Sequence, residues 1–249
     1  MILHENERVD YVNDSLSLIQ KTDGLTFGTD ALLLAGYVNG RYANAAELGG
    51  GSGIISMLLL ARDKIEHCDC IEVQEEYAQL IKRNAELNHL EGRLSACFSD
   101  IRNFTASGTY DLVFSNPPYM KSTSGAHNQK NAKTAARHEI NGNIDDFVAA
   151  ASKMLKFGGM LAAVYRPDRL CDLIAAMRTH AIEPKRMTFV HADTASESSM
   201  VLIEGKRGGK SGMQLTAPLI IYTDEKHKEY TDDMNYIMEN GSFPSIYKR

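Results

Sequence analysis

Short apolar runs and longer segments of helical periodicity alternate along most of the chain. The apolar runs, each bounded by glycine, proline or polar residues, predict β-strands at 43–48, 65–73, 94–98, 112–114 and 159–165. Between and after them, apolar residues at helical spacing predict helices at 54–61, 75–88, 145–155 and 168–180. Strands that alternate with helices are typical of a parallel α/β sheet.

Two further apolar runs, 187–191 and 200–204, predict the last long strands of this sheet. The polar segment 192–199 joins them and is too short for a crossover helix, so the two strands must run antiparallel. We therefore expect a mostly parallel sheet that ends in an antiparallel hairpin. Residues 218–222 form one more strand-like stretch, and the remaining tail is polar.

Residues 1–40 precede the predicted core strands. The apolar run 31–35 predicts a buried helix capped by Thr29 or Asp30. We expect this N-terminal segment to close over one end of the domain. The predicted organisation is a cap segment at 1–40, a core at 41–205 and a C-terminal extension at 206–249 that packs on the core.

Composition narrows the class of protein. A chain of 249 residues with 43% hydrophobic and 24% charged residues fits one soluble α/β domain. The polar N-terminus resembles no signal peptide and no apolar run reaches the ~18 residues of a membrane span, so we expect a cytoplasmic protein without membrane contact. No second ligand pair stands at zinc spacing, so we expect no metal and interpret the cysteines as free thiols: Cys68, Cys70, Cys97 and Cys171.

Charge is unevenly distributed. A net charge of −5 argues against a protein that coats nucleic acid non-specifically. Two segments nevertheless carry basic residues without an acid, and either solvated loops or local phosphate contacts explain them. The basic residues are Lys121, Lys130, Lys133 and Arg137 in the first segment, and Lys206, Arg207 and Lys210 in the second.

A glycine-rich turn at 49–53 joins the first core strand to the helix that follows. This arrangement places backbone amides and a helix N-terminus at the carboxyl edge of the sheet, where ligands of α/β proteins bind. Ser52 and Ile54 stand where a dinucleotide fingerprint needs glycine, and the pattern present is Glu47-x-Gly49-x-Gly51-x-Gly53. An acid at this place repels a pyrophosphate and attracts an ammonium group, which favours a cofactor that carries an amino acid over NAD.

Two more carboxylates end neighbouring strands. Glu72 lies nineteen residues after Gly53, where a carboxylate accepts both ribose hydroxyls of a nucleoside cofactor. Asp100 ends the next strand and is placed to accept from an adenine amine, with Ile101 against the ring. The sequence therefore predicts a nucleoside site along this edge.

The strand at 112–114 stops at Asn116-Pro117-Pro118-Tyr119. Proline cannot donate to a strand ladder, and each proline restricts the residue before it to extended backbone. We expect this stiffness to direct the Asn116 side-chain carbonyl and the Pro117 backbone carbonyl to one point, with the Tyr119 ring beside them.

Two acceptors next to an aromatic ring suit a planar group that bears an NH2. Two N–H···O bonds hold such an amine toward tetrahedral geometry and bring its lone pair forward, so that an electrophile placed in line is attacked without a strong base. The alternative is an ordinary Pro-Pro turn with a surface tyrosine. The motif is specific only together with the electrophile site upstream.

Together these residues resemble the class I S-adenosylmethionine methyltransferases, a Rossmann-like fold of seven strands with the same closing hairpin. Asn-Pro-Pro-Tyr is similar to the amino-methyltransferase motif of that class, and the chain resembles the tRNA1(Val) adenine-37 N6-methyltransferase family. The likeness covers most of the chain and is carried by Phe27-Gly28-Thr29-Asp30, Glu47 to Gly53, Asn116 to Tyr119, Ala136-Arg137-His138-Glu139, Tyr165-Arg166-Pro167, and Gly205 to Gly209 before Pro218-Leu219.

The resemblance implies S-adenosylmethionine as cofactor and an adenine N6 amine of a tRNA anticodon loop as acceptor. The implied cofactor residues are Glu47, Gly49, Gly51 and Gly53 for the methionine end, Glu72 for the ribose, Asp100 and Ile101 for the adenine, and also Val73, Phe27 and Thr29. Asn116 and Pro117 would hold the target amine, and Pro118 and Tyr119 complete the motif with Tyr119 stacked on the base. The basic residues of the two acid-free segments would contact tRNA phosphates.

Glu47 stands where aspartate is commoner in this class, which preserves the charge. Residues 137–139 match a family pattern, but their spacing indicates no chemistry.

Three alternatives stay open. Protein glutamine N5-methyltransferases use the same tetrapeptide on a carboxamide, but they carry a larger helical domain in front of the core. Amines in DNA or ribosomal RNA present the same geometry. A non-catalytic RNA-binding protein that has kept the fold is the third, although both the glycine turn and the acceptor pair are intact.

Overall fold

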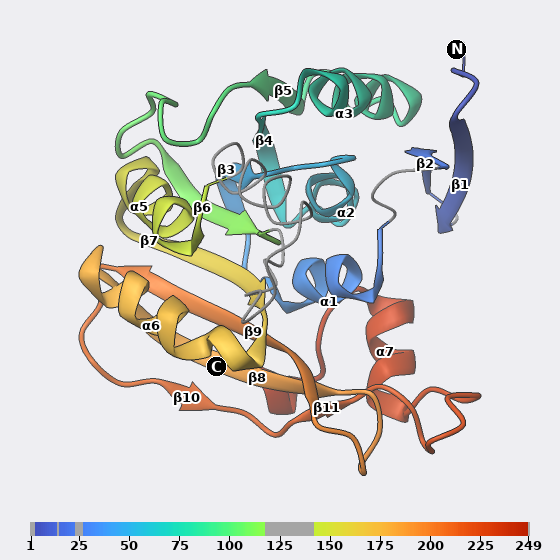
Figure 1. Ribbon diagram of the computed structural model, residues 1–249, viewed down its shortest axis with the longest axis vertical. Coiled ribbons are helices and arrows are strands. Elements are labelled where there is room, and N and C mark those ends of the chain that lie inside the picture. The colour runs from blue at the N-terminus through green and yellow to red at the C-terminus, as the bar shows by residue number, and fades with distance from the viewer. Residues whose placement is uncertain (1–2, 14, 23–26, 118–141, 249) are drawn as a thin grey trace, which may run out of the picture.

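The computed structural model describes residues 3–13, 15–22, 27–117 and 142–248 (Figure 1). Within them the central sheet has nine strands in the order β10-β8-β9-β7-β6-β3-β4-β5, with β11 also paired to β8. The strands are β3 Tyr42–Leu48, β4 Ile65–Glu72, β5 Leu94–Phe98, β6 Tyr110–Ser115, β7 Leu155–Tyr165, β8 Ile182–His191, β9 Ser198–Arg207, β10 Gln214–Leu215 and β11 Leu219–Ile220.

The sheet is mostly parallel, as predicted, and β9 runs antiparallel to both β7 and β8. The closing hairpin is thus confirmed. The sheet has two strands more than the expected seven, β10 and β11, which are two residues long and pair in parallel with β8. The strand β11 lies within the strand-like stretch predicted at 218–222, whereas β10 was not predicted, because a run this short carries no periodicity from which a strand is recognised.

Helices cover both faces of the sheet (Figure 1). The face covered by α1, α2 and α7 holds one hydrophobic cluster, and α5 and α6 pack together over the other. The helices are α1 Thr29–Tyr37, α2 Ile54–Ala61, α3 Glu75–Leu87, α5 Ile144–Met154, α6 Leu170–Thr179 and α7 Asp232–Asn240, with 3-10 turns η1 Pro167–Arg169 and η2 Ser245–Tyr247.

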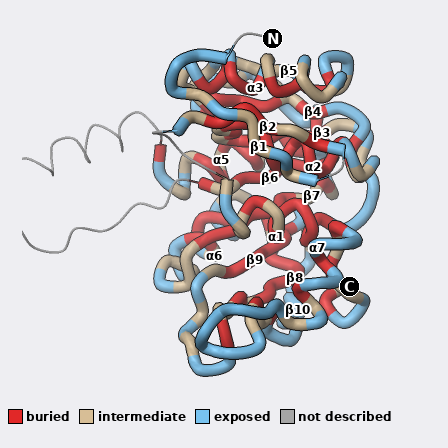
Figure 2. The backbone as a smooth tube through the Cα atoms, turned by 90° about the vertical axis from the view of Figure 1, so that its right-hand side faces the viewer, coloured by how far each residue is buried: buried red, intermediate tan, exposed pale blue. Residues whose placement is uncertain are grey.

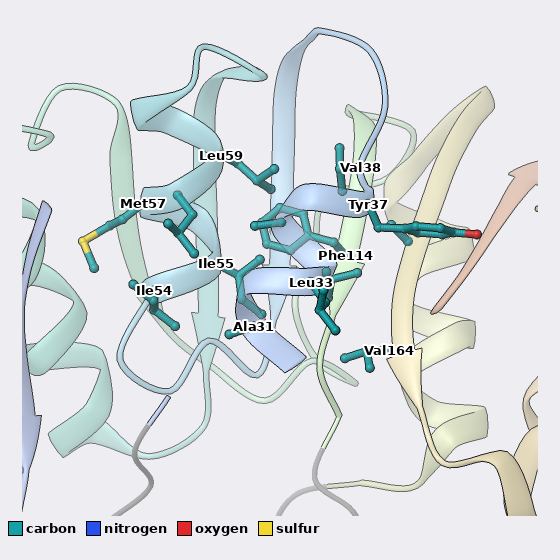
Figure 3. Packing of buried hydrophobic residues seen from close by; sticks show 14 of the residues in the cluster. Ala31, Leu33, Tyr37, Val38, Ile54, Ile55, Met57, Leu59, Phe114 and Val164 are labelled. Atoms are coloured by element: carbon teal, nitrogen blue, oxygen red, sulfur yellow. The ribbon is translucent and has the colours of Figure 1, made fainter. Parts of the chain in front are cut away.

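The core between α1, α2 and the sheet is built from aliphatic and aromatic side chains. Figure 3 shows Leu33, Ile55 and Phe114 pointing into the same space between α1, α2 and β6. Leu33 and Phe114 have no exposed surface. The buried parts of the chain follow the strands and the inner faces of the helices (Figure 2). Helices α1 and α2 thus pack against β3 and β6 in one cluster.

The N-terminal segment contains a hairpin that the sequence analysis did not predict. Strands β1 (Glu7–Asn13) and β2 (Leu16–Lys21) form a separate antiparallel pair. The buried Asn84 of α3 accepts from the Ile19 backbone N–H at 2.7 Å and donates to the Ile19 carbonyl at 3.1 Å. It also donates to the Ser52 carbonyl at 2.9 Å, so one amide joins the hairpin to the glycine turn.

The polar tail also carries structure that was not expected. Phe243 and Tyr247, after α7, pack edge-on in a row with Tyr37 of α1. The buried Arg186 of β8 donates to the backbone carbonyls of Tyr37 and Tyr247 and pairs with Glu204. The last residues therefore pack on the core, while the three-segment division of the chain stays a prediction.

Candidate active site

The carboxyl ends of β3, β4 and β6 meet at one edge of the sheet (Figure 1). The Ser115 hydroxyl at the end of β6 donates to the Leu48 carbonyl at the end of β3, at 2.7 Å. The glycine turn and Asn116 therefore begin side by side, at the edge where α/β proteins bind their ligands.

The glycine turn has an alternating conformation that explains the spacing of its glycines. Gly49, Gly51 and Gly53 have φ angles of +73°, +55° and +79°, in the left-handed region that favours glycine. At Gly50 the requirement is space, because an added Cβ would lie 2.0 Å from the Cys70 sulfur. The turn thus favours glycine at 49, 51 and 53 for its backbone conformation and requires it at 50 for space.

Glu72 lies directly beside this turn. Its Oε2 accepts from the Gly51 backbone N–H at 3.0 Å, and its Oε1 accepts from the Gln74 N–H at 2.9 Å. Each carboxylate oxygen has a further lone pair. The structure thus brings this carboxylate against the glycine turn, with acceptors left for a diol.

Glu47 points beneath the N-terminus of α2. Its Oε2 accepts from the Ser56 backbone N–H at 3.2 Å and from the Ser56 hydroxyl, with the Cys70 thiol at 3.5 Å. Burial raises the pKa of the Glu47 carboxyl to about 7, against the opposing effect of these hydrogen bonds. Glu47 thereby satisfies a free amide of α2, whose N-cap Gly53 has no side chain. The sequence analysis missed this role.

Asn116 is held by Asp30, for which the sequence predicted a helix cap and no contact with Asn116. Its Nδ2 donates to Oδ2 of Asp30 at 2.7 Å. Its Oδ1 is buried and accepts no hydrogen bond from the residues that the structure describes. A buried carbonyl oxygen without a donor is costly and uncommon, so this atom is an acceptor available to a ligand.

The predicted helix cap at Thr29 or Asp30 is wrong. The N-cap of α1 is Gly28, and Thr29 and Asp30 are its first helical residues. The Asp30 carboxylate is engaged by Asn116 and by the adjoining Ala31 backbone N–H, at 2.9 Å. The Asp30 side chain therefore does not cap the backbone amides further along the first turn of α1.

Asp100 follows β5, two strands from β3 in the sheet. Hydrogen bonds from Arg102 lower the pKa of its carboxyl, and the Arg102 Nε lies 2.9 Å from Oδ1. Ile101 beside it is buried. Asp100 is therefore already paired with a cation, which the sequence did not indicate.

Two cavities lie at opposite edges of the sheet, one beside the carboxyl end of β7 and the other beside the amino ends of β3 and β4. One of about 340 Å³ opens beside Asp30 and is lined by Thr29, Asp30, Arg166, Ser199 and Met200. Another of about 470 Å³ is lined by residues 36–41 and Lys64, which precede β3 and β4. Of these two, the smaller cavity adjoins the Asn116 side chain, through its Asp30 partner.

The remaining predicted residues divide into three groups. Val73 follows β4 directly, and the Phe27 backbone N–H donates to the Gln20 side chain at 2.7 Å. The basic segment 206–210 begins near the far end of β9. By the strand register Lys206 lies level with Met160 of β7 and Leu112 of β6, about 13 Å along the strands from Asn116 at ~3.3 Å per residue. Outside the described residues lie Pro118, Tyr119, Lys121, Lys130, Lys133, Arg137, His138 and Glu139.

Comparison with known proteins decides the family. The family model described as the methyltransferase small domain matches residues 21–180. The chain belongs to this family. In the described residues of this methyltransferase, no helix is long and apolar enough to cross a membrane. The same residues contain no group of three or more His, Cys, Asp or Glu side chains that could hold a metal ion.

Two curated relatives of this methyltransferase carry the same name. A protein of Porphyromonas gingivalis is 28% identical over 71% of this chain and 72% of its own length, and is named tRNA1(Val) (adenine(37)-N6)-methyltransferase. A protein of Aliivibrio salmonicida with the same name is 23% identical over 73% of this chain and 77% of its own.

Solved structures share the fold. A predicted O-methyltransferase of Agrobacterium tumefaciens superposes with a TM-score of 0.70 at 23% identity, over 86% of this chain and 98% of that one. The TYW2 protein of M. jannaschii, solved with AdoMet, superposes with a TM-score of 0.57 at 14% identity, over 83% and 88%. The methyltransferase fold predicted from the sequence is confirmed.

Proposed function

We propose that this methyltransferase transfers a methyl group from S-adenosylmethionine to the exocyclic N6 amine of an adenine in tRNA, namely adenine 37 of the anticodon loop. The names of the relatives support the substrate. The observation that carries the chemistry is the buried Asn116 Oδ1, which accepts no described hydrogen bond. It lies at the strand end next to the glycine turn, where a target amine can supply the missing donor.

The cofactor supplies an electrophilic methyl group on a sulfonium. The left-handed glycines and the carboxylate of Glu72 fit such a nucleoside with an amino-acid arm, because they present backbone amides and acceptors along one edge. In this proposal Glu72 and Val73 hold the ribose, and Asp100 and Ile101 hold the adenine. Glu47 supports the turn beneath the methionine end of the cofactor through its hydrogen bonds to Ser56, and Phe27 and Thr29 close over the site.

The protein activates the amine by positioning. Two N–H···O bonds, to Asn116 Oδ1 and to the Pro117 carbonyl, bring the nitrogen lone pair forward, and the proton is lost after the methyl has transferred. An anticodon-loop adenine is already partly single-stranded, so turning it out costs less than from a duplex. Stacking on Tyr119 would contribute about 1–3 kcal/mol. Tyr119, the phosphate contacts of the basic residues and a cytoplasmic location stay predictions.

The proposal is tested by offering labelled S-adenosylmethionine with tRNA, ribosomal RNA, DNA and protein in parallel reactions. We expect label in tRNA, and its loss in Asn116→Ala. Asn235→Ala, which removes an exposed amide on α7, is the matched control and keeps wild-type activity. Label in protein alone would indicate the glutamine methyltransferase, and label in DNA or ribosomal RNA alone a different nucleic-acid target. Binding of tRNA without transfer to any of the four would indicate a non-catalytic protein.

A further inference from the structure

The hydrogen bond between α1 and the end of β6 gives Asp30 a role in the reaction. We propose that Asp30 is a positioning residue that keeps the Asn116 carbonyl oxygen turned toward the target amine. This inference rests on the proposed function and adds a residue to its site.

A carboxylate only accepts hydrogen bonds, whereas the two ends of a carboxamide differ: one donates and one accepts. Because Asp30 Oδ2 lies 2.7 Å from Asn116 Nδ2, the NH2 end of the amide faces Asp30. The Oδ1 end is thereby turned away from Asp30, buried and without a described donor. An amide turned over would place two acceptors against each other and offer the substrate amine a donor.

The Asp30 carboxylate is itself fixed on both oxygens. Oδ1 accepts from the Ala31 backbone N–H at 2.9 Å, while Oδ2 accepts from Asn116. Both contacts require an acceptor, so a carboxylate is needed and an amide cannot make the two together. The negative charge behind the amide also polarises it and strengthens Oδ1 as an acceptor.

Gly28 leaves room for this carboxylate. A Cβ built at Gly28 would lie 2.8 Å from Asp30 Oδ1. Its backbone is extended, with φ −118°, so the requirement is space and not an unusual conformation. In the motif Phe27-Gly28-Thr29-Asp30, the glycine thus leaves space for the Asp30 side chain, which orients Asn116.

The pair allows a swap experiment. In Asp30→Asn, the new amide keeps the Ala31 contact through its oxygen and turns its NH2 toward Asn116, whose own amide turns over. In Asn116→Asp two carboxylates face each other. In the double variant, the amide at position 30 donates to the carboxylate at position 116, and the second oxygen of that carboxylate again faces the target amine. The variants are compared by kcat and by KM for tRNA and cofactor.

We expect each single variant to lose on the order of 10–100-fold in kcat, the scale of one charge-assisted hydrogen bond, with KM for the cofactor within about threefold. The double variant recovers on the order of 10-fold over either single. Gly28→Ala loses kcat as Asp30→Asn does. Asp172→Asn, an exposed acid in the first turn of α6, is the control and keeps wild-type kcat. Losses that multiply in the double variant, or wild-type kcat in Asp30→Asn, would overturn the proposal.

A readout without substrate separates this inference from the proposed function. The Asn116 side-chain NH2 resonances in an ¹H–¹⁵N spectrum should move in Asp30→Asn while the backbone spectrum is retained. Unmoved resonances would show that the hydrogen bond is not made. Should the wild-type protein methylate no RNA while those resonances do move, the substrate assignment fails and the Asp30–Asn116 pairing stands.

Discussion

At the scale of single residues, the site depends on which polar atoms are paired and which are available. Glu72 uses one lone pair on each oxygen for backbone amides. Asn116 is paired at Nδ2 and unpaired at Oδ1 among the described residues. Glu47 is buried and serves the N-terminus of α2. The candidate site thus combines acceptors fixed by the protein with acceptors left for ligands.

The buried Glu47 predicts a specific pH dependence of stability. Its pKa rises from 4.5 to about 7 in the folded protein. Between these values the native state binds more protons than the unfolded state, so its contribution to stability is fully present below pH 4.5 and is lost as pH rises through 7. The difference in free energy of unfolding between wild type and Glu47→Gln should fall by up to about 3 kcal/mol across this window, measured by urea denaturation. Parallel pH profiles for the two proteins would contradict it.

Glu72 makes a prediction for cofactor binding. Glu72→Ala removes the acceptor that holds the Gly51 amide and the proposed ribose contact. We expect the affinity for S-adenosylmethionine, measured by calorimetry, to fall on the order of 10–100-fold. Glu75→Ala, an exposed acid in the first turn of α3, should bind as wild type. Equal affinities of the two variants would exclude Glu72 from the cofactor site.

The residue pattern predicted part of the site. Glu72 and the alternating glycines were predictable because they occupy fixed places in one strand-turn-helix-strand unit, β3 to β4, and the structure brings them together. The Asp30–Asn116 pair was not, because its members lie 86 residues apart and no local spacing relates them. The Arg102 partner of Asp100 is only two residues away, yet nothing in the spacing of Asp100 indicated that its carboxylate is paired.

At the scale of elements, the periodic segments were predicted well and the irregular ones were not. Helix α2 has the predicted bounds, 54–61, because its residues up to Leu60 are buried and its start follows the glycine turn. The hairpin of β1 and β2 was missed, because the backbone of β2 is bound by Asn84 of α3 and by Asn88 at the end of that helix, both distant in sequence. Their side chains bind backbone N–H and C=O groups of Ser17 and Ile19 that a neighbouring strand would otherwise bind.

Asn84 is therefore predicted to hold two elements together. Asn84→Ala leaves the Ile19 N–H and the Ser52 carbonyl without this partner. We expect a loss of about 2–4 kcal/mol in the free energy of unfolding, from several buried polar groups at about 1–3 kcal/mol each. Hydrogen exchange should show the Ile19 amide losing protection first. Exchange at Ile19 as slow as in wild type would contradict this account, and Asn235→Ala serves again as the exposed control.

At the scale of the whole molecule, a buried ion pair connects the C-terminus to the core. Arg186 is 1% exposed, pairs with Glu204 at 2.8 Å and stacks on the Tyr37 ring at 3.8 Å. Burial raises the pKa of the Glu204 carboxyl, which the charge of Arg186 opposes. Arg186 thus joins the tail to the core through the Tyr247 carbonyl, and nothing in the sequence pattern singled it out.

Arg186→Ala should cost about 3–5 kcal/mol of stability, because it leaves Glu204 buried without its partner. Arg186→Met with Glu204→Gln removes both charges and should cost less than the single change. Thermal and urea unfolding of the three proteins tests this. An equal or larger loss in the double variant would show that the unpaired charge of Glu204 is not the cause of the loss.

The central claim is that the amine held at Asn116 is the N6 amine of adenine. Its most direct measurement is mass spectrometry of the nucleosides of unmodified tRNA after incubation with the protein and S-adenosylmethionine. We predict N6-methyladenosine with wild type and none with Asn116→Ala. A methyl group on a ring nitrogen, a carbon or a ribose, or N6-methyladenosine formed equally by Asn116→Ala, would contradict the account.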